Sequence, residues 1–234
     1  MLRKETVTLG TLELLKELMQ DDNLKPFTLV GGTALALQIA HRSSIDIDLF
    51  SKEGFDVATV GDYLKEKYQF QQEYSARNTL KGNINGVKVD LITHAYPNVL
   101  ETLKVENVRM ATVNDIAAMK LNAIVNNGTR IKDFVDIAYL SDQLTLKQMV
   151  NAYGIKYTQD NPTQALKALN FHNDIDFKEP VHLLKGNFNW QDIQKRLKAM
   201  ALYPDKLFSP MPIPTENTKK GDRGENDNNQ DLGR

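Results

Sequence analysis

Two aspartates one residue apart, Asp46 and Asp48, are the residues of this chain best suited to chemistry. Side chains alternate between the two faces of a β-strand, so on a strand both carboxylates point to one face. The opposite face then holds Ile45, Ile47 and Leu49, which places the strand beside an apolar core. Two carboxylates beside a core repel each other unless a cation neutralises them. The pair therefore predicts a site for a hard divalent cation such as Mg²⁺.

Two glycines, Gly31 and Gly32, end a predicted strand over residues 27–30 and precede a predicted helix over residues 33–40. Backbone N–H groups at glycines can approach a phosphate without interference from a Cβ atom. The glycines do not form a Walker A loop, because no Gly-Lys-Thr or Gly-Lys-Ser follows them. Together with the two acids, they predict a nucleotide held by backbone amides and magnesium.

A third acid, Asp90, lies in a predicted strand over residues 87–93, after the hairpin signal Asn85-Gly86. If that strand neighbours the acidic strand, three carboxylates would hold two magnesium ions roughly 3.5–4 Å apart. Such ions activate an attacking hydroxyl and stabilise the leaving pyrophosphate, and Asp90 is then the expected proton acceptor. The alternative is a surface acid that pairs with Lys88 or with another strand residue.

Lys120 lies four residues after Ile116 and four before Ile124, inside the apolar stripe of a predicted helix. A lysine in that position either extends along its own stem to the surface or brings its ammonium group to an internal anion. A nucleoside triphosphate is the candidate anion.

Two further acids, Asp133 and Asp136, lie in the next predicted helix, residues 132–140. The helix dipole favours Asp133 near the helix start, and Lys132 with Asp136 has the spacing of a helical ion pair. Either acid could instead contact a ribose or position Lys120. Structural and functional roles therefore both stay open for these acids.

The four histidines of the chain have no metal-ligand spacing. The dipeptide His41-Arg42, directly before the acidic strand, could contact a phosphate or an acceptor, or could belong to an ordinary loop. No Gly-x-Ser-x-Gly motif is present, so the sequence gives no support for a serine hydrolase.

Composition excludes several other classes. The 234 residues include 29 basic and 30 acidic residues, a net charge of −1, so any nucleic-acid binding must use a local patch. Without cysteine, disulfides, thiolate catalysis and cysteine-based zinc sites are excluded. No apolar run has the length of a membrane span, and the first residues lack the apolar region of a signal peptide. We expect a cytoplasmic protein with no membrane partner.

Hydrophobic spacing predicts mixed α and β structure to about residue 110 and helices afterwards. The proline-rich, polar stretch 209–234 is expected to be a disordered tail. The other predicted elements are strands over 45–51, 69–76, 79–84, 87–93 and 105–110, and helices over 8–19, 57–68, 113–126, 132–140, 144–153, 163–170 and 189–201.

These motifs resemble a known family. Gly31-Gly-Thr-Ala-Leu followed by Asp46-Ile-Asp48 is similar to the DNA polymerase β-like nucleotidyltransferase superfamily. More narrowly, the run from His41 to Phe50, His-Arg-x-Ser-x-Asp-Ile-Asp-Leu-Phe, resembles the AbiEii/AbiGii toxin family. Asp115-Ile-Ala-Ala-Met-Lys120-Leu and Lys132-Asp-Phe-Val-Asp136-Ile also resemble that family. The resemblance covers roughly residues 27–140.

The resemblance implies an α+β fold: a nucleotidyltransferase core with a mixed β-sheet flanked by helices, followed by an all-helical C-terminal region. We expect the core in residues 1–110, the helical domain in 111–208 and the tail in 209–234.

The resemblance also implies roles for individual residues. The metal ligands would be Asp46, Asp48 and Asp90, and Lys120 would lie near the nucleotide phosphates. The late motif aspartate would be Asp136 or, as the alternative, Asp133. The superfamily often has Gly-Ser where this chain has Gly31-Gly32, so Thr33 could supply the hydroxyl group to a phosphate.

The implied activity is magnesium-dependent transfer of NMP from an NTP, such as ATP, GTP or CTP, to a hydroxyl group. Family members are toxins of bacterial toxin–antitoxin or abortive phage-infection systems, and some relatives modify the acceptor end of tRNA. A winged-helix regulator would be the cognate antitoxin. Two alternatives stay open: NMP transfer to a protein hydroxyl, and a non-catalytic module that binds a nucleotide or a partner.

Overall fold

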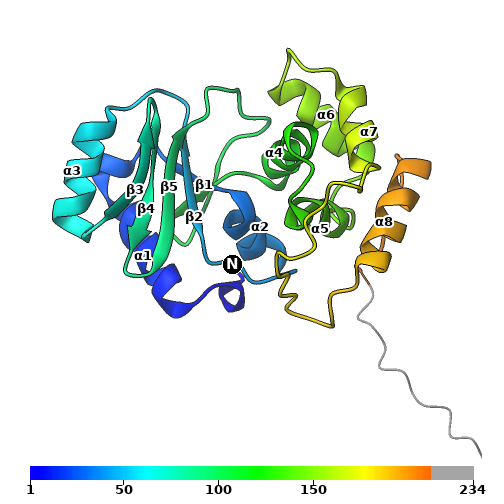
Figure 1. The fold of residues 1–234 in the computed structure, drawn as a ribbon, viewed down its shortest axis with the longest axis horizontal. Helices are drawn as coiled ribbons and strands as arrows, with labels where there is room; N and C mark the ends of the chain where they lie inside the picture. Colours follow the sequence, from blue (N-terminus) through cyan, green and yellow to red (C-terminus); the bar gives the residue numbers. More distant parts are fainter. Residues whose placement is uncertain (212–234) are drawn as a thin grey trace, which may run out of the picture.

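The computed structural model describes residues 1–211 and shows a mixed β-sheet in one half of the molecule and a group of helices in the other (Figure 1). The expected α+β class is confirmed. From residue 212 on, the predicted tail 209–234 lies outside the described residues. The helices are α1 (Leu9–Gln20), α2 (Gly31–Ile39), α3 (Val57–Tyr68), α4 (Val113–Asn126), α5 (Ile131–Leu140), α6 (Leu146–Lys156), α7 (Pro162–Leu169) and α8 (Trp190–Leu202). The strands are β1 (Thr28–Val30), β2 (Ile47–Ser51), β3 (Gln71–Ala76), β4 (Thr79–Ile84), β5 (Val87–Thr93), β6 (Leu103–Val105) and β7 (Val108–Met110).

Strand β2 lies at the centre of the sheet, whose order is β3-β4-β5-β2-β1-β7-β6. It runs antiparallel to β1 and parallel to β5. This register places Asp48 beside Val30 on one side and beside Asp90 on the other. The two acids are therefore direct neighbours, as the sequence predicts for a shared site.

The sheet face opposite Asp48 is apolar. Strand β2 contributes Ile47 and Leu49 to it, and β5 contributes Val89 and Leu91; none of these four side chains is exposed. Because side chains alternate along a strand, burial of this face directs the acids of β2 and β5 to the other face.

Local sequence explains several element boundaries. Asn85 and Gly86 join β4 to β5 with φ of 52° and 83°, as a tight hairpin requires. Threonine hydroxyl groups cap three helices by accepting a backbone N–H three residues on: Thr8 caps α1, Thr112 caps α4 and Thr145 caps α6.

Two strand predictions are wrong. Strand β2 begins at Ile47 and not at Ile45, which is 60% exposed, because the first paired residue of β2 is Ile47, opposite Val89 on β5. The single strand expected over residues 105–110 is the hairpin β6–β7, whose turn places Glu106 and Asn107 at positive φ. Strand β7 then pairs with β1 in parallel, which local spacing does not reveal.

Helix α4 joins the two halves, because it packs against α2 as well as against α5, α6 and α7. The last strand ends at Met110 and α4 begins at Val113, close to the boundary expected after residue 110. The division into separate domains stays a prediction. No helix in residues 1–211 combines the length and the apolarity that crossing a membrane requires.

Candidate active site

Asp48 and Asp90 form the centre of the site. They are register partners on the parallel strands β2 and β5; Asp48 is half-buried and Asp90 is 3% exposed. Burial raises the pKa of the Asp48 carboxyl group; the Lys120 charge opposes this rise, whereas the charges of Asp90 and Asp46 add to it. The site therefore concentrates negative charge in a region where solvent screens it poorly.

Asp90 is only partly neutralised by its surroundings. Its Oδ2 atom lies 3.1 Å from Lys81 Nζ and 3.6 Å from Lys88 Nζ. Its Oδ1 atom is buried and has no hydrogen-bond partner among the described residues. The expected alternative, a pair with Lys88, is thus present, but the carboxylate is buried beside Asp48 and not at the surface.

Asp46 lies just before β2 and is exposed. Its backbone carbonyl group accepts a hydrogen bond from the Thr33 hydroxyl group, whose oxygen also lies 2.9 Å from Ser44 Oγ. Thr33 is 1% exposed, so it fixes the segment that carries Asp46 to helix α2. A contact between Thr33 and a phosphate stays a prediction.

The two glycines make room for the protein's own charged groups. A Cβ atom on Gly31, whose φ is +70°, would lie 2.3 Å from Asp48 Oδ2. A Cβ atom on Gly32 would lie 2.4 Å from the Arg42 Nη2 atom. Both glycines lie in the first turn of α2, which has no side-chain cap, so backbone N–H groups beside Asp48 stay free of such a bond.

A buried charge network lies behind the acids and is centred on Asp136, which has 0% exposure. Arg42 donates to it twice, from Nε to Oδ1 at 2.7 Å and from Nη2 to Oδ2 at 3.0 Å. His41 Nε2 lies 2.7 Å from Oδ1, and Lys120 Nζ lies 2.9 Å from Oδ2. Lys120 also donates to Asp133 Oδ1 at 2.6 Å.

The charges of this network are set by their mutual contacts. Burial alone would raise the pKa of Asp136, but Arg42 and Lys120 outweigh it and hold that pKa well below its usual range. Burial lowers the pKa of His41 despite its bond to Asp136. His41 Nδ1 has no partner in the described part of the chain, so the neutral ring donates from Nε2.

These contacts decide between several expected alternatives. The Lys120 ammonium meets an internal anion, as one alternative has it, and the anions are the carboxylates of Asp133 and Asp136. The expected Lys132–Asp136 pair is wrong, because Lys132 pairs with Glu179 at 3.0 Å.

Neither role expected for the dipeptide His41-Arg42 describes its position: both residues are 4% exposed and bind Asp136. The sequence did offer a signal for these contacts: a histidine and an arginine directly precede the acidic strand, and a later helix carries two acids. Asp136 offers no surface to a ribose, so its arrangement favours the positioning of Lys120. Contacts of Lys120 and Asp136 with a nucleotide stay predictions.

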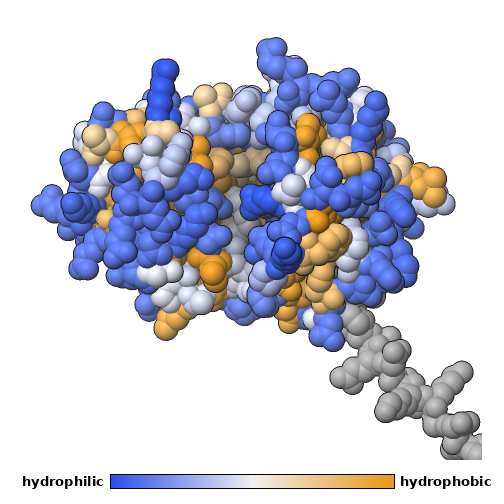
Figure 2. All heavy atoms as spheres, viewed as in Figure 1, coloured by the Kyte–Doolittle hydropathy of each residue, from blue (hydrophilic) through white to orange (hydrophobic). Residues whose placement is uncertain are grey.

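Residues 1–211 contain no group of three or more His, Asp or Glu side chains close enough to hold a metal ion. The expected ligands nevertheless fit a hard cation, because Asp48 and Asp90 adjoin and the buried Asp90 Oδ1 has no partner within residues 1–211. Figure 2 shows a hollow between the sheet and the helical half on the face that it presents. The two-metal arrangement of Asp46, Asp48 and Asp90 stays a prediction.

We predict that Gly31→Ala destabilises the chain by at least about 1–2 kcal/mol, because alanine disfavours positive φ and its Cβ atom would strike Asp48. Gly10→Ala is the matched control: Gly10 lies in α1 with nothing within 4 Å of the added Cβ atom. Alanine is the better helix former, so this control is neutral or stabilising. Urea unfolding measures both variants, and equal free energies of unfolding would contradict the close approach of Asp48.

We predict that the free energy of unfolding falls between pH 7.5 and pH 5.5. The pKa of His41 is lowered in the folded chain, so below about pH 6.5 the unfolded chain takes up a proton that the folded chain does not. His41 accounts for up to about 1.4 kcal/mol of this loss at pH 5.5. The variant His41→Gln keeps an N–H donor but does not titrate. Its loss over the same range is expected to be smaller; an equal loss would show that His41 is not the group responsible.

This chain is similar to known proteins in both sequence and fold. The model of the family described as nucleotidyl transferase AbiEii toxin, type IV toxin–antitoxin system, matches residues 13–73 and 67–205. The uncharacterised protein aq_aa25 of Aquifex aeolicus (strain VF5) is 28% identical over 179 residues, which cover 74% of this chain and 84% of that protein.

The crystal structure of JHP933 from Helicobacter pylori has a similar fold, with a TM-score of 0.51 and 16% identity over 84% of this chain and 92% of that one. A provisionally assigned nucleotidyltransferase of H. pylori gives the same score and identity over 95% of its chain. The family model spans most of the described residues, including every acid of the site. This chain therefore belongs to the AbiEii nucleotidyltransferase toxin family.

Proposed function

We propose that this chain moves an NMP group from an NTP to a hydroxyl group and releases pyrophosphate, with magnesium as its metal. The observation that carries the proposal is the register of β2 and β5, which sets Asp48 and Asp90 side by side next to Gly31. Family membership supports nucleotidyl transfer and a role as the toxin of a toxin–antitoxin system. We extend the proposal to action in phage defence, with a winged-helix antitoxin as partner.

Each residue of the site has a role in this reaction. Magnesium would be held by Asp46, Asp48 and Asp90, and when bound it neutralises phosphate charge and activates the attacking hydroxyl group. The N–H groups of the first turn of α2, which has no side-chain cap, would bind phosphate oxygens beside Asp48. Asp90 Oδ1, which has no partner among the described residues, takes the proton of the attacking hydroxyl group.

Lys120 supplies positive charge behind the acids. It is close enough to Asp48 to oppose the rise of that carboxyl group's pKa. Asp133 and Asp136 hold the ammonium group in place, and burial of the pair keeps its field strong. Lys120 is thereby oriented to offset the negative charge that the phosphates bring to the site.

An RNA acceptor, such as the end of a tRNA, fits the charges beside Asp90. Lys81 and Lys88 approach Asp90 from β4 and β5, and the Lys88 side chain is 50% exposed. Once a divalent cation neutralises Asp90, both ammonium groups are free to contact phosphates of an acceptor. A protein hydroxyl as acceptor is the alternative that the same chemistry allows.

We predict that Asp48→Asn lowers nucleotide transfer by about three orders of magnitude, because several kcal/mol of charge stabilisation are lost. The measurement incubates the protein with magnesium and each labelled NTP, with total tRNA or with cell protein, and records label transfer and pyrophosphate. Asp62→Asn on α3 is the control, since it removes an equal charge from an exposed position.

Retained transfer in a folded Asp48→Asn variant would contradict the metal site. NTP binding by the unaltered chain without pyrophosphate release, with every base and both acceptor pools, would favour a non-catalytic binding module. Label on protein and not on tRNA would favour the protein-modifying alternative.

A further inference from the structure

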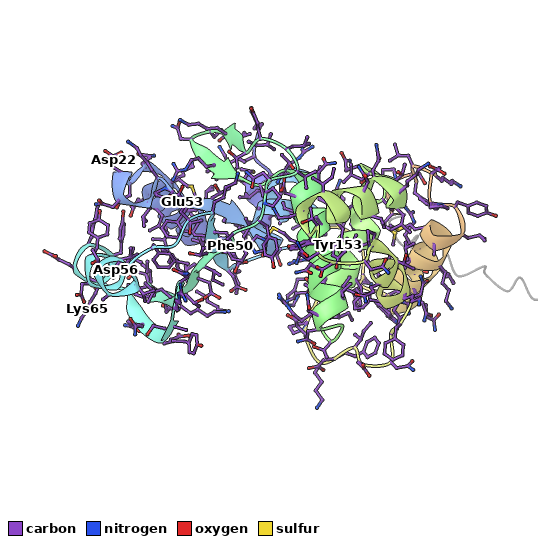
Figure 3. The ribbon with its side chains drawn as sticks, turned by 90° about the horizontal axis from the view of Figure 1, so that it is seen from above. Asp22, Phe50, Glu53, Asp56, Lys65 and Tyr153 are labelled. Carbon is purple, nitrogen blue, oxygen red and sulfur yellow. The ribbon has the colours of Figure 1, made fainter. Side chains whose placement is uncertain are left out.

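A cleft of about 420 Å³ opens beside the acids, between the sheet and the helices α4 and α6. Its floor includes Val30 of β1 and Phe50 of β2, on the same sheet face as Asp48. Figure 3 shows Phe50 of β2 near the middle of the molecule, on the side of the strands that faces the helices, where Tyr153 of α6 lies. Met119 of α4 also lines the cleft.

One wall of the cleft is held in place by a buried ion pair. Asp115 accepts hydrogen bonds from the backbone N–H groups of Val99 at 2.9 Å and Leu100 at 3.2 Å. Lys156 donates to Asp115 Oδ1 at 2.9 Å and to the Pro97 carbonyl group at 3.0 Å. The loop between β5 and β6 is thereby fixed to α4 and α6, so the cleft exists before any ligand binds.

The cleft presents uncharged planar groups. The rings of Phe50 and His94 have centroids 5.3 Å apart, and His94 Nε2 lies 3.2 Å from Tyr157 Oη. Burial, together with the charge of Lys156, lowers the pKa of His94 to about 4, so its ring is neutral at pH 7. A planar, uncharged ligand can stack on Phe50 without meeting a charge on His94.

The polar groups of the cleft suit hydrogen bonds with a heterocycle better than binding of a phosphate. The side chains of Asn98 and Thr102 are exposed at the cleft and have no hydrogen bond to another described residue. The Lys156 charge is already paired with Asp115. At the rim, Lys52 and Glu53 carry opposite charges, so they attract no anion in particular.

The order of groups along β2 places the cleft where the base of a nucleotide would lie if its phosphates were at Asp48. Gly31 and the start of α2 adjoin Asp48, and Phe50 follows two residues later, about 7 Å further along the strand. A nucleotide with its phosphates at Asp48 and α2 therefore extends its sugar and base toward Phe50. We propose that this cleft binds a nucleoside, with Phe50 stacking on the base and with Asn98 and Thr102 contacting its polar edge.

This proposal rests on the proposed function for the position of the phosphates, but the cleft can be tested without the reaction. The nucleoside has two sources: the NTP itself or the terminal nucleotide of an acceptor. Ligand-detected NMR with the full chain and adenosine, guanosine, cytidine or uridine measures binding of the nucleoside alone, with ribose as the comparison ligand. We expect at least one nucleoside to bind and Phe50→Ala to weaken it roughly tenfold or more.

The variants separate stacking from folding. Tyr74→Ala is the matched control for Phe50→Ala, because Tyr74 is a 55% exposed aromatic residue on the edge strand β3. Phe50→Trp keeps an aromatic surface and is expected to keep binding. If Phe50→Ala fails to fold, the double variant Asn98→Ala with Thr102→Val takes its place. Both side chains are exposed and lack hydrogen bonds within the described chain, so their replacement is not expected to disturb folding. The double variant is expected to weaken nucleoside binding at least threefold.

Calorimetry with magnesium and either an NTP or inorganic tripolyphosphate identifies the source of the nucleoside. If Phe50→Ala weakens the NTP roughly tenfold and leaves tripolyphosphate unchanged, the cleft holds the base of the NTP. If the NTP is unaffected but the KM for a nucleic-acid acceptor rises, the cleft holds the acceptor's terminal nucleoside. Both results support the proposal.

Two results together overturn the proposal. The first is that no nucleoside binds the unaltered chain. The second is that a folded Phe50→Ala variant, or the double variant if Phe50→Ala does not fold, changes neither the NTP affinity nor the KM for the acceptor. Failure of the proposed function looks different. In that case nucleosides bind in a Phe50-dependent way, but no NTP yields pyrophosphate with either acceptor pool.

Discussion

The buried carboxylate of Asp136 is the contact on which the arrangement of the site depends. It joins three segments that are distant in sequence: the loop with His41 and Arg42, helix α4 through Lys120, and its own helix α5. A buried carboxylate without these partners would cost several kcal/mol, so the network holds only when the segments dock together. Since the loop leads directly into β2, the same contact fixes the start of the acidic strand against the helical half.

From this contact the rest of the site follows in order. Arg42 reaches Asp136 past Gly32, where a side chain would block its guanidinium group. Asp48 lies against Gly31 for the same reason, and the parallel pairing of β2 and β5 brings Asp90 beside it. Asp133 and Asp136 hold the Lys120 ammonium group in place, and its charge in turn favours the ionised form of Asp48. The charges are thus balanced around Asp136, whereas the pair Asp48 and Asp90 keeps an excess of negative charge.

Much of the fold could be predicted because its signals are local. The strand pattern and the Asn85-Gly86 turn placed β4, β5 and Asp90 on β5, and helical spacing gave α3 with its observed bounds. The contacts of Asp136 could not be predicted, because its partners Arg42 and Lys120 lie 94 and 16 residues away and no local period connects them. The same limit explains the parallel pairing of β7 with β1 and the roles of the two glycines. A local signal can also mislead. The alternation of apolar residues begins at Ile45, but strand β2 is paired only from Ile47 on, so Ile45 is exposed.

The central claim is that Asp48 and Asp90 form one cation site, and electron paramagnetic resonance with Mn²⁺ in place of Mg²⁺ tests it most directly. Titration of the full chain in the presence of a non-hydrolysable NTP counts free and bound Mn²⁺ without any need for turnover. The account predicts protein-dependent Mn²⁺ binding that Asp48→Asn and Asp90→Asn each weaken at least roughly tenfold, as expected when a charged ligand is lost. Asp62→Asn is predicted to leave binding unchanged. Equal Mn²⁺ binding by all four folded proteins, or none by the unaltered chain, would contradict the account.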